Sequence, residues 1–191
     1  RRSTLSREST RSSRDSCVQR ARVIADFQFG RGAGKGLFPD DCDFIFSRTG
    51  RVRQITWNGS RLATLRASDG RLTLGMAGAI RLHHALPPPA YRVSIVPEVA
   101  EFILKGKNAF CKHVVAADPT IRSGDEVLVV TRDDELLATG AAVLSGEEML
   151  VFNYGVAVKV RQGRSAHDAG KYQPQEDEAD DEAAGDAGGA V

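Results

Sequence analysis

The stretches FILKGKNAF (residues 102–110) and ADPTIRSGDEVLVV (residues 117–130) decide the fold of the carboxy-terminal half of the chain. Just before the first stretch, Pro97 can occupy the first turn of a helix, and Gly106 is a residue type that ends helices. In the second stretch, small polar residues typical of a turn lead into an apolar run typical of a buried strand. We therefore expect one helix beside a small, partly closed barrel of short strands, at residues 109–117, 126–131, 136–144 and 156–161.

The preceding part of the chain has the pattern of a small mixed domain. Residues 51–57 and 61–66 alternate between polar and apolar side chains, and Asn58-Gly59 joins them. Two alternating runs joined by Asn-Gly are typical of a β-hairpin. Residues 76–86 have apolar positions at helical spacing, which predicts a helix.

Composition divides the chain further. The ends differ from the middle, because the first residues are rich in Arg and Ser and the last are rich in Asp, Glu, Ala and Gly. Such segments bury too little apolar surface to offset the entropy of ordering them, although a basic leader could also serve as an arm that grips nucleic acid. The expected fold class is α+β, a small α/β domain followed by a β pseudo-barrel. We expect a disordered basic leader at 1–21, the α/β domain at 22–89, the barrel at 90–163 and a disordered acidic tail at 164–191.

Overall composition narrows the class of protein. The 191 residues are 41% hydrophobic and 27% charged, which suffices for a buried core. No apolar run approaches the roughly 18 residues that a membrane span needs, and no secretory signal is recognisable. Three widely spaced cysteines form no disulfide framework. We expect a cytoplasmic protein with no membrane partner.

Motifs for nucleotide binding, metal binding and catalysis are incomplete or absent in the sequence. The glycine-rich stretch at 30–36 matches neither nucleotide-binding template, since no register gives G-x-G-x-x-G and Gly36 follows Lys35 where the other template needs Ser or Thr. The cysteines form no C-x-x-C pair, and adjacent His83 and His84 on a helix point about 100° apart. No G-x-S-x-G or H-E-x-x-H motif is present. The sequence therefore predicts no catalytic residue, no metal site and no cofactor.

The pattern of basic residues is more informative about function than these motifs are. A cluster of arginines lies in and around the predicted hairpin, where Asp69 is the only acid. The guanidinium group suits phosphate because its planar fork donates two hydrogen bonds at once. An ordinary solvated sheet face is the alternative. The candidate phosphate-binding residues are Arg48, Arg51, Arg53, Arg66 and Arg71.

A second basic run, KGKNAFCK (residues 105–112), lies where the predicted helix ends and the barrel begins. Gly106 lacks a Cβ, so its backbone can approach a phosphate or ribose closely. Asn108 can read a base edge or a 2′-hydroxyl. The candidate residues of this run are Lys105, Gly106, Lys107, Asn108 and Lys112.

The order of these segments resembles a PUA domain. The match comprises FILKGKNAF, the "I-x-x-GDEV" strand of residues 117–130, ATGAAVLS (138–145) and the closing strand of YGVAVKVR (154–161). The preceding block resembles the small α/β domain before the PUA domain in archaeal archaeosine tRNA-guanine transglycosylases. Its matching segments are IADFQFG (24–30), SRTGRVR (47–53), LATLRASDGRLTL (62–74) and GAIRLH (78–83).

The resemblance covers about residues 22–163 and implies a PUA-type pseudo-barrel that binds structured RNA, in this group the acceptor end of tRNA. It places the Lys105–Asn108 junction on the RNA-facing side and adds Lys112, Lys159 and Arg161 as weaker candidates. The catalytic aspartates and zinc of the transglycosylases lie on a large barrel domain for which these residues leave no room. A zinc set of three Cys and one His and the P-C-x-x-K-P-Y motif of archaeosine synthase are also not visible.

The resemblance therefore transfers binding and not catalysis. We expect a non-catalytic RNA-binding protein, whose RNA is tRNA and whose role is linked to archaeosine-type modification, with a separate tRNA-modifying enzyme as a further partner. Two alternatives remain open: a detached subunit of a split transglycosylase, and a protein-binding adaptor.

Overall fold

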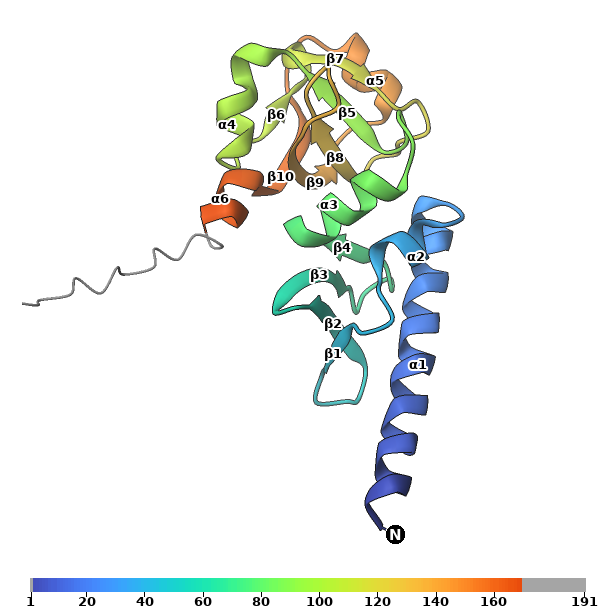
Figure 1. Cartoon of the computed structure of the whole chain (residues 1–191). Coiled ribbons are helices and arrows are strands. Elements are labelled where there is room, and N and C mark those ends of the chain that lie inside the picture. The colour runs from blue at the N-terminus through green and yellow to red at the C-terminus, as the bar shows by residue number, and fades with distance from the viewer. Residues whose placement is uncertain (1, 170–191) are drawn as a thin grey trace, which may run out of the picture.

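The computed structural model describes residues 2–169, with side chains from Ser13 to Asp168, and contains two sheets. In Figure 1 a small sheet with the long helix α1 beside it lies below a rounded barrel. The elements of the amino-terminal domain are α1 (Arg2–Phe29), α2 (Ala33–Leu37), β1 (Asp43–Phe46), β2 (Val52–Trp57), β3 (Ser60–Leu65), β4 (Leu72–Leu74) and α3 (Met76–Ala85). Those of the carboxy-terminal domain are β5 (Arg92–Ile95), η1 (Pro97–Val99), α4 (Ala100–Leu104), β6 (Ala109–Phe110), η2 (Cys111–His113), β7 (Val114–Ala117), β8 (Glu126–Val130), β9 (Leu136–Ala142), α5 (Gly146–Val151), β10 (Val156–Gly163) and α6 (Arg164–Ala169).

The amino-terminal sheet is an antiparallel meander in the order β1-β2-β3-β4. The predicted hairpin forms its centre, with Trp57 paired to Ser60 across the turn. Asn58 and Gly59 have φ angles of 48° and 74°, as a turn between twisted strands requires. The helix predicted at 76–86 is α3, which begins at Met76 and ends at Ala85.

The leader is where the structure departs from the sequence expectation. We expected residues 1–21 to be disordered, but α1 begins at Arg2 and continues without a break to Phe29. Val18, Ala21, Ala25 and Phe29 recur at helical spacing and are buried against the domain. The expectation is wrong for Val18 and Ala21, because tertiary burial of one helix face overrides the polar composition.

The carboxy-terminal sheet has the order β6-β10-β9-β8-β5-β7. Strands β5 and β8 are parallel and the other pairs are antiparallel. Because η2 joins the edge strands β6 and β7, the sheet curls into the nearly closed barrel that the sequence predicts. Its core is built from inward-facing residues such as Val93, Ile121 and Val158, together with Ile103 of α4.

The two domains share a core and a set of hydrogen bonds. Helix α3 lies between the small sheet and the barrel in Figure 1, and Leu128, Val130 and Leu136 of the barrel belong to the apolar cluster of the first domain. Arg92 of β5 is 4% exposed, and its Nη2 donates to the carbonyls of His83 and Leu86 at the end of α3. The domains are therefore packed as one unit.

The acidic tail was expected to be disordered from residue 164. Residues Arg164–Ala169 instead form α6, in which Arg164 Nε lies 3.6 Å from Asp168 Oδ2. Residues 170–191 lie outside the described part of the chain. None of the helices within residues 2–169 has the length and apolar character needed to cross a bilayer.

Candidate nucleic-acid interface

The junction between α4 and β6 is fixed by the backbone around Gly106. The N–H of Gly106 donates to Ile103 O at 2.9 Å, and the N–H of Lys107 donates to Phe102 O at 3.0 Å. This pair of bonds is a Schellman cap, which needs a left-handed residue, and Gly106 has a φ of 88°. The Gly106 and Lys107 amides are thus used by the helix end, so Gly106 shapes the turn and offers no free N–H to a ligand.

The lysines around this turn are left available. Lys105 is 67% exposed and lies 3.8 Å from Glu101, a surface pair of small energetic weight. Lys107, Lys112 and Lys159 are exposed and take part in no ion pair with any described residue. Asn108 has a structural bond as well, because its Oδ1 accepts from the N–H of Val160 at 3.0 Å and ties β6 to β10.

Exposed aromatic rings occur on the segments that carry these lysines and on the loop beside β6, and the sequence analysis missed them. Phe102 is 59% exposed, Phe110 is 43% exposed and Tyr154 is 79% exposed. Phe110 pairs with Val156, and the N–H of Cys111 donates to the carbonyl of Gly155, so the loop carrying Tyr154 lies beside β6. Aromatic residues interleaved with lysines were the available signal, since bases of single-stranded RNA stack on such rings. We name the α4–β6 surface after these elements; it comprises Phe102, Lys105, Lys107, Phe110, Lys112 and Tyr154.

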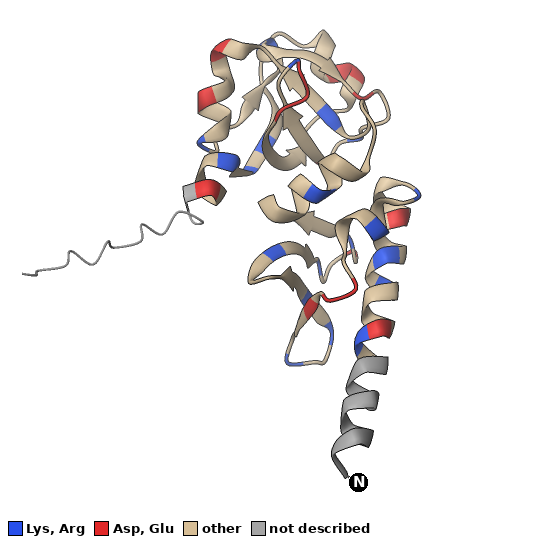
Figure 2. Cartoon of the chain, in the orientation of Figure 1, with Lys and Arg blue, Asp and Glu red and all other residues tan. Residues whose placement is uncertain are grey.

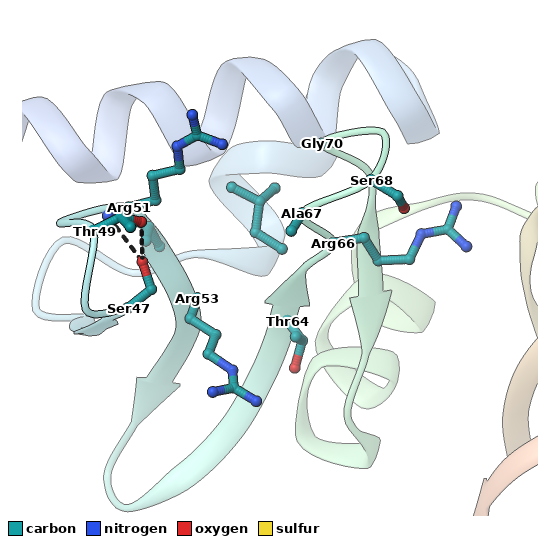
Figure 3. Close-up of a pocket in the computed structure, with 11 residues that line it drawn as sticks. Ser47, Thr49, Arg51, Arg53, Thr64, Arg66, Ala67, Ser68 and Gly70 are labelled. Carbon is teal, nitrogen blue, oxygen red and sulfur yellow. Dashed lines mark hydrogen bonds between the residues drawn. The ribbon is translucent and has the colours of Figure 1, made fainter.

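A second basic region lies on the amino-terminal domain. The turn between β1 and β2 and the turn between β3 and β4 border a groove of about 760 Å³, which we call the arginine groove. Figure 3 shows the side chains around it. It is lined by Ser47, Thr49, Arg51, Val52, Arg53, Thr64, Leu65, Arg66, Ala67, Ser68 and Gly70.

A β-bulge places Arg53 at this groove. Ile45 pairs with Gln54 but Phe46 pairs with Val52, so Arg53 is the extra residue on β2. The bulge shifts the alternation of the strand, and Val52 and Ile55 can both pack against the core while Arg53 is exposed. An exposed guanidinium thus results where strict alternation from Ile55 would place a core side chain.

The predicted arginines divide into two groups. Arg51, Arg53 and Arg66 line the groove, whereas Arg48 is exposed in the β1–β2 turn outside the lining. Arg66 also forms a 2.5 Å ion pair with Asp69 and is 40% exposed. Figure 2 shows that basic residues occur on both domains.

Arg71 joins the two domains, and Arg161 binds a carboxylate of the barrel that itself contacts the first domain. Arg71 Nη2 donates to Asp125 Oδ1 at 2.6 Å, which joins the segment before β4 to the barrel. Arg161 Nη1 donates to Glu126 Oε2 at 2.6 Å, and the same oxygen accepts from the N–H of Leu74 at 3.0 Å. Both guanidinium groups are therefore already bound to largely buried carboxylates.

The described residues contain no group of three or more His, Cys, Asp or Glu side chains placed to hold a metal ion. Burial raises the pKa of the Cys42 thiol to about 11, with a further contribution from the charge of Asp41. Burial likewise raises the pKa of Cys111. Both thiols are protonated at neutral pH and are poor nucleophiles or metal ligands there.

Comparison with known proteins identifies both domains. The family model described as the patch-forming domain C2 of tRNA-guanine transglycosylase matches residues 19–89, and the PUA domain model matches residues 91–164. The chain is 51% identical over 152 residues to the tRNA-guanine(15) transglycosylase of Pyrococcus abyssi, covering 80% of this chain and 26% of that protein. It is 50% identical over 147 residues to that of Methanothermobacter thermautotrophicus, covering 76% of this chain and 22% of that protein. The chain therefore spans about a quarter of the length of these curated relatives.

Solved structures agree on the fold. A hypothetical protein from Pyrococcus horikoshii superposes with a TM-score of 0.61 at 22% identity, covering 78% of this chain and 90% of the other. A conserved PUA domain protein from Thermoplasma acidophilum superposes with a TM-score of 0.52 at 17% identity, covering 74% of this chain and 89% of the other. Residues 19–89 thus belong to the C2 domain family of tRNA-guanine transglycosylases and residues 91–164 to the PUA family, which confirms the resemblance found in the sequence.

Proposed function

We propose that this chain is a non-catalytic RNA-binding unit that holds the acceptor end of tRNA on its α4–β6 surface. The observation that carries the proposal is the combination of exposed lysines with exposed aromatic rings on a PUA barrel. The tRNA-guanine transglycosylase names of its relatives support tRNA as the RNA and base modification as the context. We also propose a cytoplasmic location, as expected for a protein that binds tRNA.

The physical basis is charge together with stacking. Lys105, Lys107 and Lys112 can each neutralise a phosphate, and the counterions that RNA then releases favour binding at low salt. Phe110 and Tyr154 offer flat apolar faces to unpaired bases, such as those at the single-stranded end of tRNA. The Schellman cap at Gly106 holds Lys105 and Lys107 on one rigid turn, which lowers the entropy lost on binding.

The first test measures the affinity of the full chain for a tRNA transcript by fluorescence anisotropy over a series of salt concentrations. For the double variant Lys105→Ala/Lys107→Ala we expect weaker binding. The slope of log affinity against log salt concentration should become shallower by roughly 1–2, because binding releases about one counterion fewer for each phosphate contact that is lost. Phe110→Ala should cost about 1–3 kcal/mol of binding with an unchanged salt slope, since stacking involves no counterion.

The control removes the same amount of charge elsewhere. Arg122 and Arg132 are exposed, lie in other loops of the barrel domain and form no side-chain ion pair with a described residue. Arg122→Ala/Arg132→Ala should bind tRNA much as the unaltered chain does. Equal losses in both double variants would reduce the interaction to general polyanion binding and overturn the proposal.

RNA fragments test the acceptor-end assignment. A hairpin carrying the acceptor stem with its unpaired 3′ end should compete with tRNA, whereas an anticodon-stem hairpin of equal length should compete poorly. The reverse order would show that the α4–β6 surface holds a different part of the RNA.

We further propose that the chain acts together with a catalytic tRNA-modifying unit. The relatives are about four times longer than the matched region, and their names describe the modification of guanine in tRNA. The chain would supply tRNA binding, and the partner would supply the reaction. Co-purification from cells should recover such an enzyme, and recovery of RNA alone would contradict this part of the proposal.

A further inference from the structure

The segment that follows α6, residues 170–191, carries a dense negative charge. It holds seven Asp or Glu residues and a single Lys, and six of the acids lie within residues 176–182. We infer that this acidic segment binds the α4–β6 surface of its own chain and competes there with RNA for the lysines. The competition with RNA rests on the proposed function, whereas the contact within the chain can be tested without RNA.

The fold brings the acidic segment to the lysines. Strand β10 ends at Gly163, whose backbone packs directly against the end of α4, because a Cβ at this position would collide with Leu104 O and Gly106 N. Helix α6 starts at the next residue and contacts α4, and in Figure 1 the two helices lie side by side. The acidic segment therefore leaves the barrel beside the turn that carries Lys105 and Lys107.

The lengths involved allow the contact. Helix α6 has 6 residues and extends about 9 Å from the end of β10, at a rise of about 1.5 Å per residue. Seven residues lead from Ala169 to Glu176, and a chain of that length spans at most about 25 Å. A tether this short gives the acids an effective concentration of roughly 1 mM at the lysines.

The α4–β6 surface has the complementary charge. Lys105, Lys107 and Lys112 are exposed, and the 3.8 Å pair between Lys105 and Glu101 is a weak surface interaction that a ligand can displace. An ammonium group binds carboxylate and phosphate alike, as a point charge. The acidic segment thus presents to these lysines the same kind of charge that an RNA backbone presents.

An occupied surface binds RNA more weakly. The loss in affinity equals one plus the ratio of the effective concentration of the segment to the Kd of its contact. A Kd about two- to tenfold below the effective concentration therefore weakens RNA binding by about three- to tenfold. Salt near 1 M should abolish the effect, because it shortens the screening distance to about 3 Å.

The first experiment measures the reactivity of lysines in the free, full-length chain. A neutralised variant replaces the six clustered acids: Glu176→Gln, Asp177→Asn, Glu178→Gln, Asp180→Asn, Asp181→Asn and Glu182→Gln. At low salt, the N-hydroxysuccinimide ester of acetic acid should acetylate Lys105 and Lys107 about three- to tenfold more slowly in the unaltered chain than in this variant, as measured by mass spectrometry.

Two controls accompany this measurement. Lys35 is exposed on α2 of the amino-terminal domain and should react equally in both proteins. A variant that exchanges Asp and Glu at the six positions keeps the charge and should protect the lysines as the unaltered chain does. Equal acetylation of Lys105 and Lys107 in the unaltered and neutralised chains would overturn the inference.

The second experiment measures tRNA affinity by fluorescence anisotropy. Neutralising the six acids should raise the affinity of the full chain about three- to tenfold at low salt. In the Lys105→Ala/Lys107→Ala background the same change should raise it less than about twofold, because the segment has lost its binding site. An equal gain in both backgrounds would indicate general repulsion between the segment and RNA, and would overturn the inference.

The outcomes distinguish this inference from the proposed function. If neutralisation raises affinity in the lysine variant but not in Arg51→Ala/Arg53→Ala, the segment binds the arginine groove and the inference is overturned. If no form of the chain binds tRNA while Lys105 and Lys107 are protected by the acids, the proposed function fails and the contact within the chain stands.

Discussion

Gly106 links the stability of the fold to the geometry of the proposed RNA surface. Its left-handed φ of 88° allows α4 to end and the chain to turn into β6 within four residues. A Cβ placed there would meet only the backbone N of Gly163, at 3.8 Å, so space is not the constraint. Conformation is the constraint, because an L-residue other than glycine resists this region.

Replacing Gly106 therefore gives a defined cost. Gly106→Ala should lower the free energy of unfolding by about 1–2 kcal/mol, because alanine must adopt the left-handed region. Gly106→Asn should cost less, since asparagine tolerates that region. Urea denaturation measures both, and an alanine variant as stable as the unaltered chain would show that the cap can rearrange.

Helix α1 illustrates how an element is stabilised from one side. Phe29 is 3% exposed and meets the ring of Tyr91 edge-on, with ring centroids 5.3 Å apart. The hydroxyl of Tyr91 donates to the carbonyl of Gln28, so the end of α1 is fastened to the segment that enters the barrel. Phe27, two residues earlier, is 93% exposed.

These two phenylalanines make a matched comparison. Phe29→Ala should lower the free energy of unfolding by about 3–5 kcal/mol, because it leaves a cavity and removes the contact with Tyr91. Phe27→Ala should change it by less than about 0.5 kcal/mol, because its ring contacts mainly solvent. Urea denaturation of the two variants measures both changes. Similar losses of unfolding free energy would contradict the burial of the Phe29 face of α1.

Elements with local signals were predictable from the sequence. Asn58-Gly59 between alternating runs predicted the hairpin, apolar spacing predicted α3, and Pro97 and Gly106 marked the helical segment of η1 and α4. The bulge at Arg53 was not predictable because it has no local signature, and in the leader the polar composition obscured the sparse helical spacing of Val18 and Ala21. Both depend on which residues find a core to pack against, and that is a property of the tertiary structure.

Only part of the candidate site was predictable, because residue type is visible in the sequence but the partner of each charged side chain is not. Residue type located Arg51, Arg53 and the lysines of residues 105–112, but it could not separate exposed from engaged arginines. Arg71 finds Asp125 at a separation of 54 residues, and Arg161 finds Glu126 at a separation of 35. Such partners are set by tertiary packing, between the two domains for Arg71 and within the barrel for Arg161. The RNA-binding roles of the candidate residues remain predictions.

At the scale of the whole molecule, the domain contact determines whether the two domains move together. The shared apolar cluster includes Leu128 and Leu136 of the barrel, and Arg92 bridges to the end of α3. The pKa of Asp134 reports the same contact. Partial burial alone would raise it, but the hydrogen bond and charge of Arg92, aided by His83, outweigh burial and hold it below its ordinary range. These apolar and polar contacts hold the two domains in one arrangement.

Glu126 offers a direct test of this coupling. Its carboxylate is 4% exposed and accepts from both the Leu74 N–H and Arg161, so Glu126→Ala leaves a buried N–H and a guanidinium without their partner. Such unsatisfied groups should lower the free energy of unfolding by about 1–3 kcal/mol.

Trp57, the single tryptophan, reports on the amino-terminal sheet, whereas far-ultraviolet circular dichroism reports on both domains. If the domains unfold as one unit, the two signals should give a single urea midpoint in the unaltered chain, and Glu126→Ala should shift both by the same amount. Glu135→Ala, which removes an exposed carboxylate in the turn before β9, is the control and should shift neither. Separate midpoints in the unaltered chain would show that the domains unfold independently, which would contradict their packing as one unit.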